Sequence, residues 1–215
     1  QSNTIAAASR QLVDDIALAR QMAINNRSTV HMLFMGPALQ TDLAALTPSV
    51  LATNLLKQQF VGYTLFAERT LGDQPGQAFP RYLTTWRTLP DGIFIAPTKF
   101  TGANYADLNG RRVDFLAFEF SDFPYPRGDS TTKSKFYFIT FDPSGRVVSR
   151  ISPDGLCVIP LARGSIFLEQ GAGGGYLFTP ANPYERPANN WQENPVLIII
   201  DAATGRARLE QPELQ

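Results

Sequence analysis

The chain has 215 residues, and its 19 basic side chains balance its 19 acidic ones. This even charge argues against a nucleic-acid-binding surface and against a polybasic membrane-surface binder, since both need clustered positive charge. The single cysteine, Cys157, excludes an internal disulfide and a cysteine-based zinc site. The length is compatible with one domain, and we expect a single domain over residues 1–215.

The first 26 residues predict an amphipathic helix. Spacings of three and four residues place one apolar stripe on a single helical face. The stripe consists of Leu12, Ile16, Ala19 and Ala23, joined by Ser9 and widened by Ile5, Val13 and Ile24. Arg10, Asp14 and Asp15 are expected largely off this stripe. Asn25 and Asn26 are expected to end the helix, because asparagine tolerates the left-handed conformation of a helix C-terminus.

Residues 27–215 predict a β-rich head. Sixteen glycines and sixteen prolines, with Asp and Gly at the reversals, indicate short antiparallel strands between turns. Strands are expected at 29–35, 60–68, 86–89, 93–96, 112–120, 135–141, 147–151, 156–161, 165–168, 195–201 and 206–210. Long loops are expected at 36–59 (with a short helix over 49–59), 97–111, 121–135 and 169–195. The fold class is therefore α+β, with one N-terminal helix packed on two antiparallel sheets.

Candidate catalytic residues are few. His31 is the only histidine and lies in an apolar strand, and no Gly-x-Ser-x-Gly sequence accompanies it. Paired carboxylates could come from Asp114, Glu119 and Asp122, which would suit a glycosidase, although solvated strand edges are the simpler interpretation. We expect no catalytic residues.

Candidate binding motifs are also weak. The glycine-rich run at 171–175 lacks the Lys-Ser/Thr of a phosphate-binding loop. The segments 142–145 and 201–205 resemble calcium loops in outline, but they lack the alternating Asp/Asn ligands and predict ordinary turns. We expect no cofactor and no metal ion. Cys157 is expected to be a buried apolar residue.

Six aromatic side chains are expected in loops. Exposed loop aromatics can form a surface for protein or carbohydrate partners, or they can fold back and cap the sheets. The sequence leaves both alternatives open. The six are Tyr105, Phe123, Tyr125, Tyr176, Tyr184 and Trp191.

Four segments, taken in order, carry a resemblance to a known family. Residues 12–32, 138–146 and 197–208 are similar to the helix-to-strand signature, the strand-turn and the closing hairpin of type II secretion minor pseudopilins of the H class and their type IV pilus relatives. Residues 89–92 resemble the Leu-Pro-x-Gly turn of that family. In the first segment the matching residues are Leu12, Ala19-Arg20, Ala23-Ile24, Asn26 and Val30.

The resemblance implies a structural subunit rather than an enzyme. Such a subunit acts by assembly, with other pseudopilin or pilin subunits as partners and no small-molecule substrate. The family's leader and hydrophobic N-terminal helix are absent from this sequence, and we expect a truncation ahead of Gln1. That missing segment would anchor the chain in the bacterial inner membrane, with the head in the periplasm or on a cell-surface filament.

The long loops at 36–59, 97–111 and 169–195 exceed what we expect for the family. Two alternatives from other classes stay open. One is a secreted carbohydrate-binding β-sandwich that uses the loop aromatics, and the other is a carboxylate-based hydrolase.

Overall fold

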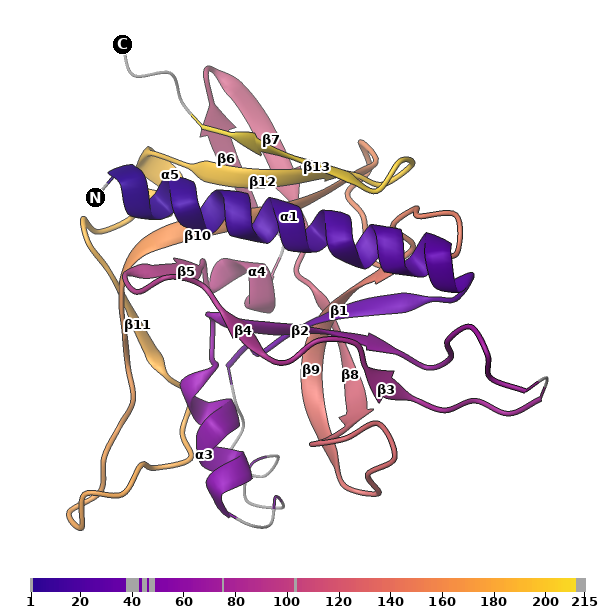
Figure 1. Cartoon of the computed structure of the whole chain (residues 1–215). Helices are drawn as coiled ribbons and strands as arrows, with labels where there is room; N and C mark the ends of the chain where they lie inside the picture. The colour runs from indigo at the N-terminus through magenta and orange to yellow at the C-terminus, as the bar shows by residue number, and fades with distance from the viewer. Residues whose placement is uncertain are drawn as a thin grey trace.

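The computed structural model describes residues 2–37, 43, 46, 49–74, 76–102 and 104–211. The chain is mixed α and β, with an N-terminal helix and antiparallel sheets (Figure 1). The described helices are α1 (Ser2–Asn26), α3 (Ser49–Lys57), α4 (Thr98–Thr101) and α5 (Asn190–Glu193).

Helix α1 is a continuous helix of 25 residues, as the apolar spacing predicts. Its end at Asn26 confirms the predicted boundary, but the left-handed residue is Arg27, with φ 48°, and not an asparagine. The Arg27 N–H donates to Ile24 O and the Ser28 N–H donates to Ala23 O, both at 3.2 Å. These two bonds form a Schellman motif that turns the chain directly into the first strand.

The first sheet is built around the strand that follows α1. Its order is β3-β2-β1-β9-β8, and β4 also pairs with β2. Its strands are β1 (Val30–Phe34), β2 (Gly62–Ala67), β3 (Arg81–Tyr82), β4 (Arg87–Thr88), β8 (Glu119–Pro124) and β9 (Lys133–Phe141). We call it sheet A. All its pairs are antiparallel. Strand β1 pairs with both β2 and β9, and it therefore lies at the centre of the sheet.

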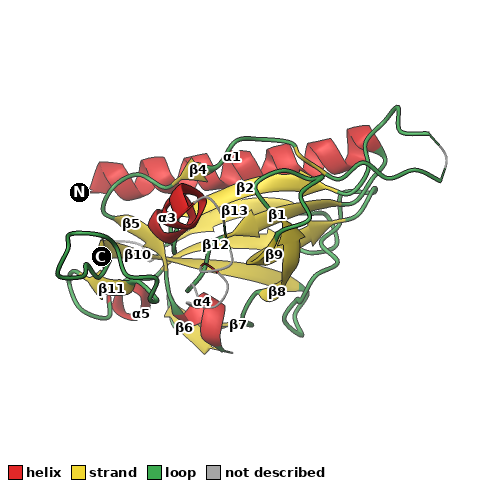
Figure 2. Cartoon of the chain, turned by 90° about the horizontal axis from the view of Figure 1, so that it is seen from below, coloured by secondary structure: helices red, strands yellow, loops and turns green. Residues whose placement is uncertain are grey.

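The second sheet, sheet B, has the order β11-β10-β12-β13, and β5 also pairs with β10. Its strands are β5 (Ile93–Ile95), β10 (Leu156–Phe167), β11 (Asn182–Glu185), β12 (Val196–Asp201) and β13 (Arg206–Glu210). A separate hairpin joins β6 (Asn104–Leu108) to β7 (Arg111–Phe115), so the two expected sheets are accompanied by a third, two-stranded one. In Figure 2 this hairpin lies on the side of the strands opposite α1.

Three of the predicted loops contain regular structure. Residues 97–111 hold α4 and β6, residues 121–135 include the end of β8 and the start of β9, and residues 169–195 hold β11 and α5. Helix α3 confirms the short helix expected within 36–59, although residues 38–42, 44, 45, 47 and 48 lie outside the described part of the chain.

Three strand predictions also need correction. The expected strand 112–120 is interrupted, because the Leu116 carbonyl accepts a bond from Lys99 Nζ and the Phe118 N–H donates to Lys99 O. The expected strand at 147–151 forms only an isolated bridge between Phe141 and Val147. The two short strands expected over 156–168 are one long strand, β10.

Strand β1 packs side chains on both faces of sheet A. Side chains of Val30, Met32 and Phe34 join the main core, which also holds α1 and sheet B. The alternate residues Leu33 and Met35 point to a second cluster, which α3 covers. One strand therefore supplies two cores, which explains why both of its faces are apolar in the sequence.

Candidate functional site

The predicted stripe of α1 is its contact with the head. The side chains of Leu12, Ile16, Ala19 and Ala23 are all fully buried. Figure 1 shows α1 lying across strands of both sheets, and its contacts reach β1 and β9 of sheet A and β12 and β13 of sheet B. Burial of Leu12 and Ile16 stabilises this contact by about 1.5–3 kcal/mol each.

A polar anchor holds the middle of α1, and sequence reasoning missed it. Asp15 was expected off the stripe, but it is only 6% exposed. The Tyr63 hydroxyl on β2 donates to Asp15 Oδ2 at 2.6 Å, and Arg87 on β4 forms an ion pair with the same carboxylate. Gln11 Nε2 donates to the Tyr63 hydroxyl oxygen at 2.7 Å and to Thr88 O at 2.8 Å.

This anchor is satisfied internally. Burial, followed by the hydrogen bond to Asp15, raises the pKa of Tyr63 well above its usual value, so the hydroxyl stays protonated as a donor. The signal in the sequence was present: Asp15 lies three residues after Leu12 and four before Ala19, which is the spacing of the stripe itself.

A second anchor holds the C-terminal part of α1. Arg20 Nε donates to Thr204 O at 2.7 Å, in the turn between β12 and β13. A methyl group added at Gly205 would overlap the Gly145 carbonyl oxygen and touch Arg20, and one added at Gly145 would touch Arg20 and Ile24. The two glycine turns therefore close against each other and against the helix.

Both of these turns are built on an aspartate. Asp142 Oδ1 accepts bonds from the Ser144 N–H at 2.8 Å, the Ser144 hydroxyl at 2.6 Å and the Arg146 N–H at 2.9 Å. Asp201 Oδ1 accepts bonds from the N–H and the hydroxyl of Thr204, both at 2.8 Å.

The turn bonds also set the charge of the two aspartates. They lower the pKa of Asp201, and they lower that of Asp142 against an opposing effect of burial. The carboxylates thus serve as turn acceptors, in agreement with the turn interpretation of these segments.

The outer face of α1 is exposed along its length. The exposed positions recur every three or four residues, so they form a second stripe opposite the buried one. They are Asn3, Ala7, Arg10, Asp14, Ala17, Gln21 and Asn25. The stripe carries one basic and one acidic side chain and two alanines, a surface that a second helix can approach closely.

The six aromatics expected in loops divide into two groups. Phe123, Tyr125 and Trp191 are buried, with exposed fractions of 7%, 5% and 8%. Phe123 belongs to β8 and Trp191 to α5, where its ring packs edge-on to Phe115 at 6.0 Å. These three cap the cores, which is the second of the two alternatives that the sequence leaves open.

The remaining three aromatics lie nearer the surface. Tyr105 on β6 and Tyr184 on β11 are exposed, and Tyr176 is partly buried in the 169–181 segment, where Lys57 Nζ lies 5.3 Å from its ring centre. The Arg112 guanidinium covers the Tyr105 ring at 4.1 Å. Tyr105 and Tyr184 are therefore strand residues on separate sheets.

His31 is a packing residue in this fold. Its ring lies 5.4–6.5 Å from the rings of Phe66, Phe123 and Phe138, and its Nδ1 is 2.9 Å from the Thr140 hydroxyl oxygen. Burial lowers the pKa of His31, while the negative charge of Glu68 acts in the opposite direction. The neutral imidazole thus sits within an aromatic cluster.

The three candidate carboxylates occupy different positions on β7 and β8. Asp114 on β7 forms an exposed ion pair with Arg112 at 2.7 Å. Glu119 and Asp122 both lie on β8, three residues apart, so they point to opposite faces of the strand. The structure does not place them as a facing pair.

Buried Lys99 is a polar core residue that the sequence did not reveal. It is 1% exposed, its Nζ donates to Leu116 O at 2.6 Å, and it lies 4.7 Å from the centre of the Phe118 ring. Burial lowers the pKa of Lys99 and raises that of Cys157, which is buried as expected. Lys99 ties α4 to the segment between β7 and β8.

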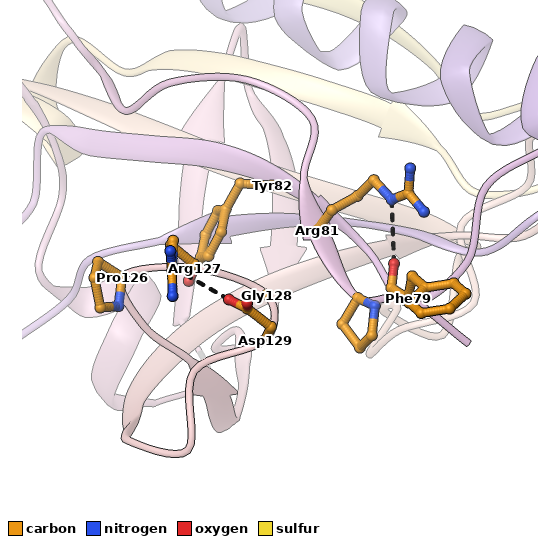
Figure 3. Close-up of a pocket in the computed structure, with 8 residues that line it drawn as sticks. Phe79, Arg81, Tyr82, Pro126, Arg127, Gly128 and Asp129 are labelled. Atoms are coloured by element: carbon orange, nitrogen blue, oxygen red, sulfur yellow. Dashed lines mark hydrogen bonds and ion pairs between the residues drawn. The ribbon is translucent and has the colours of Figure 1, made fainter. Parts of the chain in front are cut away.

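A cavity of about 420 Å³ lies where two loops meet (Figure 3). Phe79, Arg81 and Tyr82 line one side, and the segment 126–129 lines the other. Its charges are already paired: Arg81 bonds to Asp73 at 2.7 Å and Arg127 to Asp129 at 3.2 Å.

The Gly171–Gly175 run is a turn in which the Gly171 N–H donates to Gly175 O at 2.8 Å. It does not line this cavity.

Comparison with known protein families, with characterised proteins and with solved structures gives no significant match. Among the described residues, no helix combines the length and the apolar character that crossing a membrane requires. In the same part of the chain, His, Cys, Asp and Glu side chains do not gather in groups of three or more that could hold a metal ion.

Proposed function

We propose that the chain is a minor pseudopilin-like structural subunit of a type II secretion or type IV pilus-like filament. The observation that carries the proposal is the two-sided character of α1. One face is buried on both sheets, and the opposite face is exposed from Asn3 to Asn25. A helix with this division can join a helical filament core while it still carries its head.

The segments that prompted the resemblance also meet in space. Arg20 comes from the first segment, Gly145 from the second and Thr204 with Gly205 from the third. Arg20 bonds to Thr204 and lies beside both glycines, which abut each other. Each turn alone is a common feature of proteins. Because the three segments meet at α1, together they fix the head on the helix.

The proposed subunit acts by assembly. An upstream apolar half of the helix would sit in the inner membrane or among like helices of the filament, and the head would lie in the periplasm or on the filament surface. A contact between unlike faces of successive subunits extends without closing, which is how such a polymer grows. The pseudopilin-type packing of helix on sheet is part of this proposal.

The encoded sequence upstream of Gln1 tests the proposal. We expect a short basic leader and then about 20 mainly apolar residues that run without interruption into α1. A cleavable secretory signal followed directly by Gln1 would contradict the proposal, because the helix would then have no membrane half.

A further inference from the structure

We propose that a cavity between α3 and the strands beside it binds one sugar ring of a glycan. The cavity has a volume of about 210 Å³. Its lining consists of Asn54, Leu55 and Lys57 from α3, Gln58 directly after α3, and the aromatic residues Trp86 and Tyr125. This site does not depend on the filament proposal, and the two can fail separately.

The side chains of Asn54, Gln58, Trp86 and Tyr125 make no hydrogen bond to any of the residues that the structure describes. Gln58 Oε1 is buried without a partner among the described residues. Asn54 is exposed and Trp86 is half-buried, so their polar groups can bond to water or to a ligand that enters the cavity.

The larger cavity beside Arg81 and Arg127 provides the contrast. Its charged side chains are satisfied by Asp73 and Asp129, so a ligand there would have to compete with existing ion pairs. In the cavity beside α3, Lys57 forms no ion pair with a described residue, and its ammonium lies over the Tyr176 ring. The smaller cavity is therefore the better prepared for an added polar ligand.

The composition of the cavity fits a pyranose ring. Two amides, an indole N–H and a phenol hydroxyl supply both donors and acceptors, which hydroxyl groups on a ring can match. Trp86 and Tyr125 supply aromatic surface for the C–H face of such a ring. The volume is below the roughly 300–1,000 Å³ of sites for drug-sized ligands, so it suits one ring rather than several.

The two aromatic rings of the cavity pack on one buried phenylalanine. The Trp86 ring packs on Phe136 with 5.3 Å between ring centres, and the Tyr125 ring packs on Phe136 at 6.0 Å. Burial raises the pKa of Tyr125, so its hydroxyl stays a donor at neutral pH. The aromatic walls are thus held in place before any ligand arrives.

The fluorescence of Trp86 provides the test. The chain has two tryptophans, and Trp191 packs against Phe115 in the other core, so Trp191→Phe leaves Trp86 as the single reporter. We would titrate this variant with methyl glycosides of glucose, galactose, mannose, N-acetylglucosamine and glucuronic acid. We expect a saturable change in Trp86 emission with at least one of them at millimolar concentration.

Two further variants assign the site. Asn54→Ala and Tyr125→Phe each remove one polar group and should weaken that binding about tenfold. Asn25→Ala, on the exposed face of α1, should leave it unchanged. Asn54 lies at an exposed helix position, so we expect Asn54→Ala to melt at the same temperature as the parent protein. This variant therefore tests the site even if Tyr125→Phe does not fold.

Two outcomes would overturn the proposal. One is the lack of any saturable change with the whole panel up to about 50 mM, well above the roughly millimolar range in which we expect a single ring to bind. The other is binding that Asn54→Ala leaves as tight as in the parent, since the ligand would then lie elsewhere.

Discussion

The two faces of β1 show how one strand can support two different kinds of packing. Val30, Met32 and Phe34 face α1 across a core in which the polar groups, such as Asp15, are paired. The opposite face carries His31 and Leu33 into an aromatic cluster beside α3, where a cavity lined by polar and aromatic side chains lies. The first face is covered by α1, and the second by aromatic side chains and α3.

The largest effect should come from the buried apolar stripe of α1. Leu12→Ala removes a fully buried side chain between two sheets and should lower the free energy of unfolding by about 2–5 kcal/mol. Denaturant unfolding measures this loss. Leu177→Ala, at a position 43% exposed, serves as the control and should change stability by less than about 0.5 kcal/mol.

The polar anchor should give the next largest effect. Asp15→Ala leaves the buried Tyr63 hydroxyl without its acceptor and should cost about 1–3 kcal/mol. Asp14→Ala, one residue earlier on the exposed face, should be close to neutral. Equal effects of the two substitutions in thermal unfolding would mean that the anchor does not stabilise the contact. A double-mutant cycle of Asp15→Ala with Tyr63→Phe would then show no coupling energy.

Two glycine substitutions separate the cost of a left-handed backbone conformation from the cost of a close contact. Gly205 has φ 66° and abuts the Gly145 carbonyl, whereas Gly155 has φ 79° and open space around it. Both alanine variants should lose about 1–2 kcal/mol because of the backbone conformation. Gly205→Ala should lose more than Gly155→Ala in the same unfolding experiment, and equal losses would argue against tight closure of the turns on α1.

The aromatic face should show the smallest effect, as a dependence on pH. Burial lowers the pKa of His31 below 6.5, so on acidification the unfolded chain binds a proton before the folded chain does. The contribution of His31 to the free energy of unfolding therefore falls as the pH drops below 6.5, by at most about 1.4 kcal/mol per pH unit.

The matched variant for this prediction is His31→Gln, which keeps a hydrogen-bonding group near Thr140 but does not titrate. Its unfolding free energy should show a weaker decline between neutral pH and pH 5 than that of the parent. Parallel curves for the two proteins would mean that His31 titrates normally in the folded state.

The parts of the fold that follow local rules could be predicted from the sequence. The stripe of α1 and the boundary at Asn26 follow from helical spacing, and the aspartate-glycine turns follow from turn chemistry. The hairpin of β6 and β7 also had a local signal, since Asn109-Gly110 is a favoured two-residue turn with φ values of 51° and 74°. The loop interpretation of 97–111 overlooked that signal.

The missed features depend on contacts between distant segments. The burial of Asp15 requires Tyr63 and Arg87, which lie about 50 and 70 residues further along the chain. The burial of Lys99 similarly requires the Leu116 carbonyl and the Phe118 ring. The cavity beside α3 arises only when Trp86 and Tyr125 meet Asn54, and no spacing within one segment encodes that meeting.

Protection of the outer face of α1 in cells is the most direct test of the central claim, which is that this face packs against neighbouring subunits. In a Cys157→Ser background of the full-length gene, Ala17→Cys places a thiol on the exposed stripe and Ala19→Cys places one on the buried stripe. We predict that a maleimide labels Ala17→Cys in the isolated chain but not in the assembled system, and that it labels Ala19→Cys in neither. Equal labelling of Ala17→Cys in both states would contradict the account.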